Sequence, residues 1–77
     1  MRTYDIDEKV RKQVENNFNY HIPKVEQTTR YEFLRNEART LAYEILTHTP
    51  PSREQSLALT NLEQAVFWAN AAIARNE

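Results

Sequence analysis

The chain contains neither glycine nor cysteine among its 77 residues. Phosphate-binding loops, dinucleotide-binding turns and calcium-binding EF-hands use glycine where the backbone turns sharply or approaches a ligand closely, so none occurs here in its usual form. Without cysteine, the chain has neither a disulfide nor a thiolate metal site. A domain this small seldom buries enough apolar area to be stable alone, and oligomerisation is the route that remains.

Charge and hydropathy exclude two further classes of partner. Acidic and basic residues nearly balance, with a formal net charge of −1. Non-specific binding to duplex nucleic acid requires a concentrated basic surface, whereas a small anionic ligand needs only a few local cations. No apolar run approaches the length of a membrane span, and residues 1–17 lack the pattern of a signal peptide. We therefore expect a cytoplasmic protein that binds neither duplex nucleic acid nor membranes.

The most informative stretch is residues 50–75, PPSREQSLALTNLEQAVFWANAAIAR. Pro50 and Pro51 end whatever helix precedes them, and a new helix begins at Ser52, where Gln55 completes a capping box. Apolar residues then recur at alternating spacings of three and four, a stripe along one side of a helix: Leu59, Leu62, Val66, Ala69 and Ile73. This stripe requires a partner helix.

The partner is predicted upstream, beginning near Thr28 or Thr29, because Thr29 and Glu32 have the spacing of another capping box. Helices over 28–48 and 52–76, joined by a proline turn, indicate an antiparallel hairpin. A shorter helix within 1–17, capped by Asp5 or Asp7, has a narrow apolar edge and is marginal alone. The sequence thus predicts a single all-α domain that assembles into a helical homo-oligomer.

Residues 16–26 form the main break in helical periodicity, and the linker within them, 18–26, contains Tyr20, His21, Pro23 and Lys24. Two interpretations are equally open. The segment is either a linker whose aromatic residues close the end of the hairpin, or a ligand-facing segment. Rings, an imidazole and a lysine close together suit a flat base that carries a phosphate.

The other reactive residues favour neither a metal site nor catalysis. His21 and His48 lie in different segments, and the Glu44–His48 pair has no counterpart on another helix, so His48 is expected to neutralise the negative end of its own helix. Ser52 is explained as a cap. Arg75 has two interpretations: it stabilises the helix dipole, or oligomerisation brings it to a symmetry axis as part of a ring of phosphate-binding guanidiniums.

Three stretches carry a family resemblance: YHIPK, QTTRYEFLRNEAR and the stretch 50–75. Together they resemble the phage anti-CBASS cyclic-nucleotide sponge family, known as anti-CBASS protein two, from about residue 20 to residue 75. The resemblance implies a hexamer without cofactor or enzymatic activity. It would act in the cytoplasm of the infected bacterial host, sequestering the cyclic oligonucleotide signals of anti-phage immunity without degrading them and so preventing effector activation.

The resemblance also implies residue roles. Cyclic dinucleotides such as cyclic GMP-AMP would bind between pairs of protomers, with Tyr20 stacking on a base, His21 and Lys24 beside it, and Arg35 contacting phosphate. Arg75 is the candidate for a separate cyclic trinucleotide site among three protomers. From the residues alone, a helical oligomerisation or adaptor protein with a protein partner and no nucleotide ligand stays open, because the last helix has surplus apolar surface. A phosphodiesterase is the weakest alternative.

Overall fold

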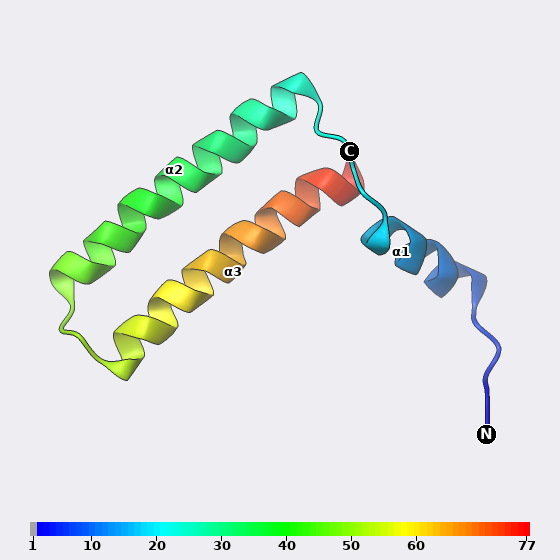
Figure 1. Ribbon diagram of the computed structural model, residues 1–77, viewed down its shortest axis with the longest axis horizontal. Coiled ribbons are helices and arrows are strands. Elements are labelled where there is room, and N and C mark those ends of the chain that lie inside the picture. Colours follow the sequence, from blue (N-terminus) through cyan, green and yellow to red (C-terminus); the bar gives the residue numbers. More distant parts are fainter. Residues whose placement is uncertain (1) are drawn as a thin grey trace.

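The computed structural model describes residues 2–77, and over this range the chain forms three α-helices and no strand. They are α1 (Glu8–Phe18), α2 (Val25–His48) and α3 (Arg53–Asn76). Helices α2 and α3 lie side by side as an antiparallel hairpin, and α1 projects from its open end (Figure 1). The predicted all-α class with a two-helix hairpin is confirmed.

Helix α1 begins at its acidic cap, since the Asp7 Oδ1 accepts a hydrogen bond from the Lys9 amide at 3.1 Å. Asp7 is one of the two predicted caps, and the helix ends at Phe18, one residue beyond the predicted range 1–17; residue 1 lies outside the described residues. The apolar edge of the helix stays exposed, with Phe18 84% accessible. One hydrogen bond ties α1 to the hairpin: Asn16 Nδ2 donates to the Arg75 carbonyl at 3.0 Å.

Helix α2 begins at Val25, earlier than the predicted Thr28, and the connecting segment is shorter than the predicted 18–26. Pro23 disfavours helix at the residue before it but allows one to begin directly after. Lys24 is the N-cap residue, and Gln27 at the third helical position supports it, since its Oε1 accepts from the Lys24 amide at 2.9 Å. The predicted Thr29 capping box was therefore wrong, because Thr29 lies inside the helix.

The turn between the long helices, residues 49–52, follows the proline signal. Helix α2 ends at His48, and Ser52 caps α3 by accepting from the Gln55 amide at 3.1 Å. The Gln55 side chain does not complete the predicted box. Its Nε2 donates instead to the Thr49 carbonyl and hydroxyl, both at 3.1 Å, and so ties the two sides of the turn together.

The open end of the hairpin is held by four polar residues, which we call the Glu77 clasp: Lys24, Gln27, Arg30 and Glu77. Arg30 forms an ion pair with Glu77, Gln27 Nε2 donates to Glu77 Oε1 at 3.3 Å, and Lys24 Nζ donates to the Glu77 carbonyl at 3.4 Å. The hydrogen bond from Arg30 lowers the pKa of the Glu77 carboxyl to about 2. Gln27, only 4% exposed, is the single buried residue in the described chain.

The hairpin has no core of its own. No apolar side chain among residues 2–77 is buried, and Trp68 is 57% exposed. The chain is a slab of 51 × 39 × 14 Å with a radius of gyration of 17.5 Å, against about 11 to 12 Å for a compact domain of this length. One layer of helices buries little apolar surface, because a core requires a second layer.

No helix in the described range is long and apolar enough to cross a bilayer.

Candidate functional site

A concave site, which we call the junction pocket, lies where α1 meets the open end of the hairpin. Its volume is about 450 Å³, within the usual range for small-molecule sites. Segments far apart in the chain line it: Asn17, Asn19, His21, Pro23, Tyr31, Arg35, Phe67, Asn70, Ala71, Ala74 and Arg75. The pocket exists because an antiparallel hairpin places the beginning of α2 beside the end of α3.

Two arginines give the junction pocket its charge. Arg35 comes from α2 and Arg75 from the last turn of α3, and none of the lining residues is acidic. The Arg75 guanidinium carbon lies 5.8 Å from the centroid of the Trp68 ring, a cation–π contact that restrains the side chain. Two guanidiniums without a nearby carboxylate in the lining can bind phosphate through paired hydrogen bonds.

His21 is held in a defined orientation at the rim. Its Nε2 lies 2.8 Å from the Asn16 carbonyl oxygen. Because a carbonyl only accepts, Nε2 carries the proton and donates it, which leaves Nδ1 as the ring nitrogen that can meet a ligand. That carbonyl belongs to the main chain of Asn16, whose side chain donates to the Arg75 carbonyl, so Asn16 couples the positions of His21 and of the last turn of α3.

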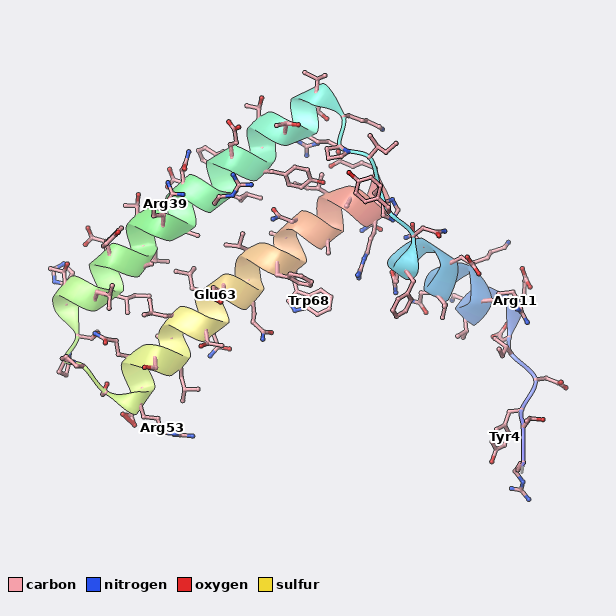
Figure 2. The ribbon with its side chains drawn as sticks, viewed as in Figure 1. Tyr4, Arg11, Arg39, Arg53, Glu63 and Trp68 are labelled. Carbon is pink, nitrogen blue, oxygen red and sulfur yellow. The ribbon has the colours of Figure 1, made fainter. Side chains whose placement is uncertain are left out.

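Two aromatic residues add flat apolar surface to the pocket, Tyr31 from α2 and Phe67 from α3. The Phe67 ring packs edge-on against Trp68, with centroids 5.7 Å apart and planes at 87°. Trp68 itself projects from the side of α3 that faces away from α2 (Figure 2). Aromatic faces beside guanidiniums suit a ligand that combines a planar base with a phosphate.

The structure brings together three of the five residues singled out from the sequence. His21, Arg35 and Arg75 line one pocket, although Arg75 was assigned to a separate site. Tyr20 and Lys24 do not line it. Tyr20 is 83% exposed, and the Lys24 ammonium is directed to the Glu77 carbonyl. In a single chain these two side chains therefore lie outside the pocket.

Sequence reasoning missed Tyr31, Phe67 and Asn70 as lining residues. A signal for Asn70 was present, since it lies one helical turn after Val66 and continues an otherwise apolar row. The hairpin register was a second signal. Residues equally distant from the proline turn lie opposite each other, and this places Tyr31 opposite Asn70.

A second cavity, of about 480 Å³, lies between α2 and α3 nearer the turn. Six of its nine lining side chains are small or aliphatic, among them Ala38, Ala42, Leu59 and Leu62, and the other three are Arg35, Arg39 and Glu63. The carboxylate of Glu63 offsets one of the two arginines, and most of the surface suits an apolar side chain rather than an anion. Arg35 lines both cavities and so marks the boundary between the apolar groove and the cationic pocket.

His48 and the acidic residues form no metal centre in the part of the chain that the structure describes. No group of three or more His, Cys, Asp or Glu side chains there could hold an ion. His48 Nε2 lies 3.1 Å from the Glu44 carboxylate, one turn back on the exposed face of α2. His48 thus lies at the negative end of its helix.

The chain was compared with known proteins at the level of families, individual sequences and structures. The family model described as Acb2/Tad1, hairpin domain, matches residues 11–74. This range includes most of α1, the whole of α2 and all but the end of α3, and therefore every residue that lines the junction pocket except Arg75. No curated protein and no solved structure matches the chain.

Proposed function

We propose, from the premise that this chain belongs to the Acb2/Tad1 hairpin domain family, that it binds cyclic oligonucleotide second messengers and retains them uncleaved. The family comprises cyclic nucleotide sponge proteins, which are non-catalytic. The expected ligands are cyclic dinucleotides such as cyclic GMP-AMP, with cyclic trinucleotides as a second class. By sequestering these messengers in the cytoplasm of an infected bacterium, this anti-CBASS protein keeps the immune effector from being activated.

The observation that supports this proposal most is the junction pocket, where two arginines and two aromatic rings meet without a lining carboxylate. In our proposal Arg35 and Arg75 bind phosphate, and Tyr31 and Phe67 provide surfaces for a base. The cations compensate the ligand's charge, and the rings replace water on the faces of the base. A sponge requires slow release, and a preformed pocket favours it because less ordering is needed on binding.

The proposal includes a homo-oligomer, for which the family likeness indicates a hexamer. The absence of any buried apolar side chain in residues 2–77 supports it, since neighbouring copies would supply the missing second layer. A cyclic dinucleotide has approximate twofold symmetry, so a site on a twofold axis can offer both halves the same residues. Tyr20 and Lys24 would then reach the ligand from a neighbouring copy.

The test of function is recovery of the ligand. Cyclic GMP-AMP is incubated with the protein, unbound nucleotide is removed by ultrafiltration, and the retained fraction is released by heat and identified by chromatography. The proposal expects depletion from free solution followed by recovery of intact cyclic GMP-AMP. Linear products would indicate a phosphodiesterase instead, and absence of depletion for cyclic di- and trinucleotides alike would refute the proposal.

A second candidate is an adaptor that recruits a protein partner through its apolar surface. The exposed Phe67 and Trp68 on α3 favour it. The proposed sponge depends on self-association of the chain, whereas the adaptor does not. Sedimentation velocity at micromolar concentration should show an oligomer for the sponge, whereas a folded monomer that ignores cyclic nucleotides would favour the adaptor.

A further inference from the structure

Asn16 is the residue through which α1 meets the hairpin. Of the residues in α1, all of which the structure describes, only Asn16 is partly buried. Its Nδ2 donates to the Arg75 carbonyl at 3.0 Å, and within residues 2–77 no other hydrogen bond or ion pair joins α1 to α2 or α3. A single polar contact therefore holds the end of α1 beside the end of α3 (Figure 1).

The bonds of Asn16 complete the ends of two helices. The last four carbonyl groups of a helix have no partner within that helix. The Asn16 carbonyl is one of these in α1, which ends at Phe18, and it accepts from His21 Nε2 at 2.8 Å. The Arg75 carbonyl is one of these in α3, which ends at Asn76, and it accepts from the Asn16 side chain. The two bonds thus form a chain from His21 through Asn16 to the last turn of α3.

This chain of bonds has both its ends in the junction pocket. His21 and Arg75 line the pocket, whereas Asn16 does not, so any effect of Asn16 on a ligand is indirect. One wall of the pocket depends on where α1 lies, because Asn17 belongs to α1 and Asn19 follows directly after it. If α1 separates from α3, this wall and His21 move away, while the walls carried by α2 and α3 stay in place.

Building on the proposed function, we infer that Asn16 is a positioning residue of the junction pocket: it holds α1 against the end of α3 and thereby slows the release of a bound cyclic oligonucleotide. Helix α1 contains no buried residue, so it can separate locally while the hairpin stays folded. Each separation opens one wall of the pocket and lets the ligand leave. The rate of release therefore depends on how often the bond between Asn16 and Arg75 is broken.

The experiment measures the rate of release by stopped-flow competition, with cyclic GMP-AMP or, in its place, the cyclic di- or trinucleotide that wild type retains in the recovery test. Asn16→Asp replaces the donating amide by a carboxylate, which only accepts. Release should become about three- to tenfold faster, the effect of one lost hydrogen bond, and the association rate should stay within about twofold of wild type. Asn16→Leu removes the donor without adding a charge and should accelerate release to a similar extent.

Two controls separate positioning from charge and folding. Gln13→Glu makes the same change of amide to carboxylate on the same helix, at an exposed residue outside the pocket lining, and should leave both rates within about twofold. In a His21→Ala background, Asn16→Asp should accelerate release by a smaller factor than in the wild-type background, because one of the groups that it positions is gone. Asn16→Asp should also keep the wild-type oligomer in sedimentation and unfold cooperatively.

Four results would overturn the inference alone: wild-type release rates in Asn16→Asp and Asn16→Leu, equal acceleration by Gln13→Glu, the same factor with and without His21, or loss of the fold or the oligomer in both Asn16 variants. The last result would assign Asn16 to folding or assembly instead of to the pocket. If wild type binds no cyclic nucleotide of any class, the proposed function fails as well, so the two failures are distinguishable.

Discussion

The two ends of the hairpin are held together in different ways. At the turn end, Ser52, Gln55 and Thr49 bond to one another within a few residues of the chain. At the open end, Glu77 bonds to residues about fifty positions earlier, and Asn16 bonds to Arg75. The turn end is therefore specified locally, whereas the open end, where the junction pocket lies, depends on the register of the whole hairpin.

The largest expected effect is the loss of both pocket arginines. Arg35→Ala with Arg75→Ala should weaken binding of cyclic GMP-AMP by at least about a hundredfold, because each charged hydrogen bond to phosphate is lost. Isothermal titration measures the affinity. Arg53→Ala removes one positive charge, half of the change in the double variant, from the turn end (Figure 2) and should leave the affinity within about twofold. Equal losses in both variants would show that overall charge, not the pocket, determines binding.

Breaking the Glu77 clasp should affect both stability and binding. Gln27→Ala leaves the Lys24 amide without its acceptor and removes a donor to Glu77. Because Gln27 is buried, we expect a loss of about 1 to 3 kcal/mol in the free energy of unfolding, measured by urea denaturation. Affinity should fall several-fold as well, since the clasp positions the end of α3. Unchanged stability would mean that the open end is held by something other than the clasp.

The matching change at the turn end should affect stability alone. Ser52→Ala removes the cap of α3 and should lower the free energy of unfolding by about 1 kcal/mol. The same urea denaturation and titration apply. Affinity for cyclic GMP-AMP should stay at the wild-type value, because the turn is remote from the junction pocket. A large loss of affinity would show that the two ends are coupled.

The smallest effect is a pH dependence confined to the clasp. The pKa of Glu77 is about 2 in the folded chain against an ordinary value of 4.5. A lowered pKa stabilises the fold above pH 4.5, and this contribution is lost as the pH falls through about 2. The difference in melting temperature between wild type and Glu77→Gln should be constant from pH 7 to pH 5 and shrink below pH 4.5. A difference that does not change with pH would exclude the ion pair as its source.

Much of the fold followed from short-range signals. The end of α2 at the prolines and the Ser52 and Asp7 caps were predictable because each involves neighbours in the chain. The beginning of α2 was mispredicted, because the spacing of Thr29 and Glu32 matches a capping box, whereas the bond that starts the helix joins the Gln27 side chain to the Lys24 amide. Gln55 was assigned the right helix but the wrong partner, because the geometry of the turn determines which acceptor it reaches.

The candidate site was less accessible to sequence reasoning. His21 was a candidate from the composition of its segment and Arg35 through family resemblance, but their position beside Arg75 depends on how the open end packs. The Glu77 clasp could not be predicted from local patterns, since nothing near Gln27 points to a residue fifty positions away. Whether Tyr20 and Lys24 reach a ligand depends on neighbouring copies, and a single chain carries no information about how they are arranged.

The most direct test of the sponge is the stoichiometry of binding. Isothermal titration of cyclic GMP-AMP into the wild-type oligomer gives the affinity and the number of sites per chain together. A twofold pocket shared by two protomers predicts tight binding with about one ligand for every two chains, and no heat of hydrolysis after saturation. No binding, or continued turnover after saturation, would contradict the proposed function.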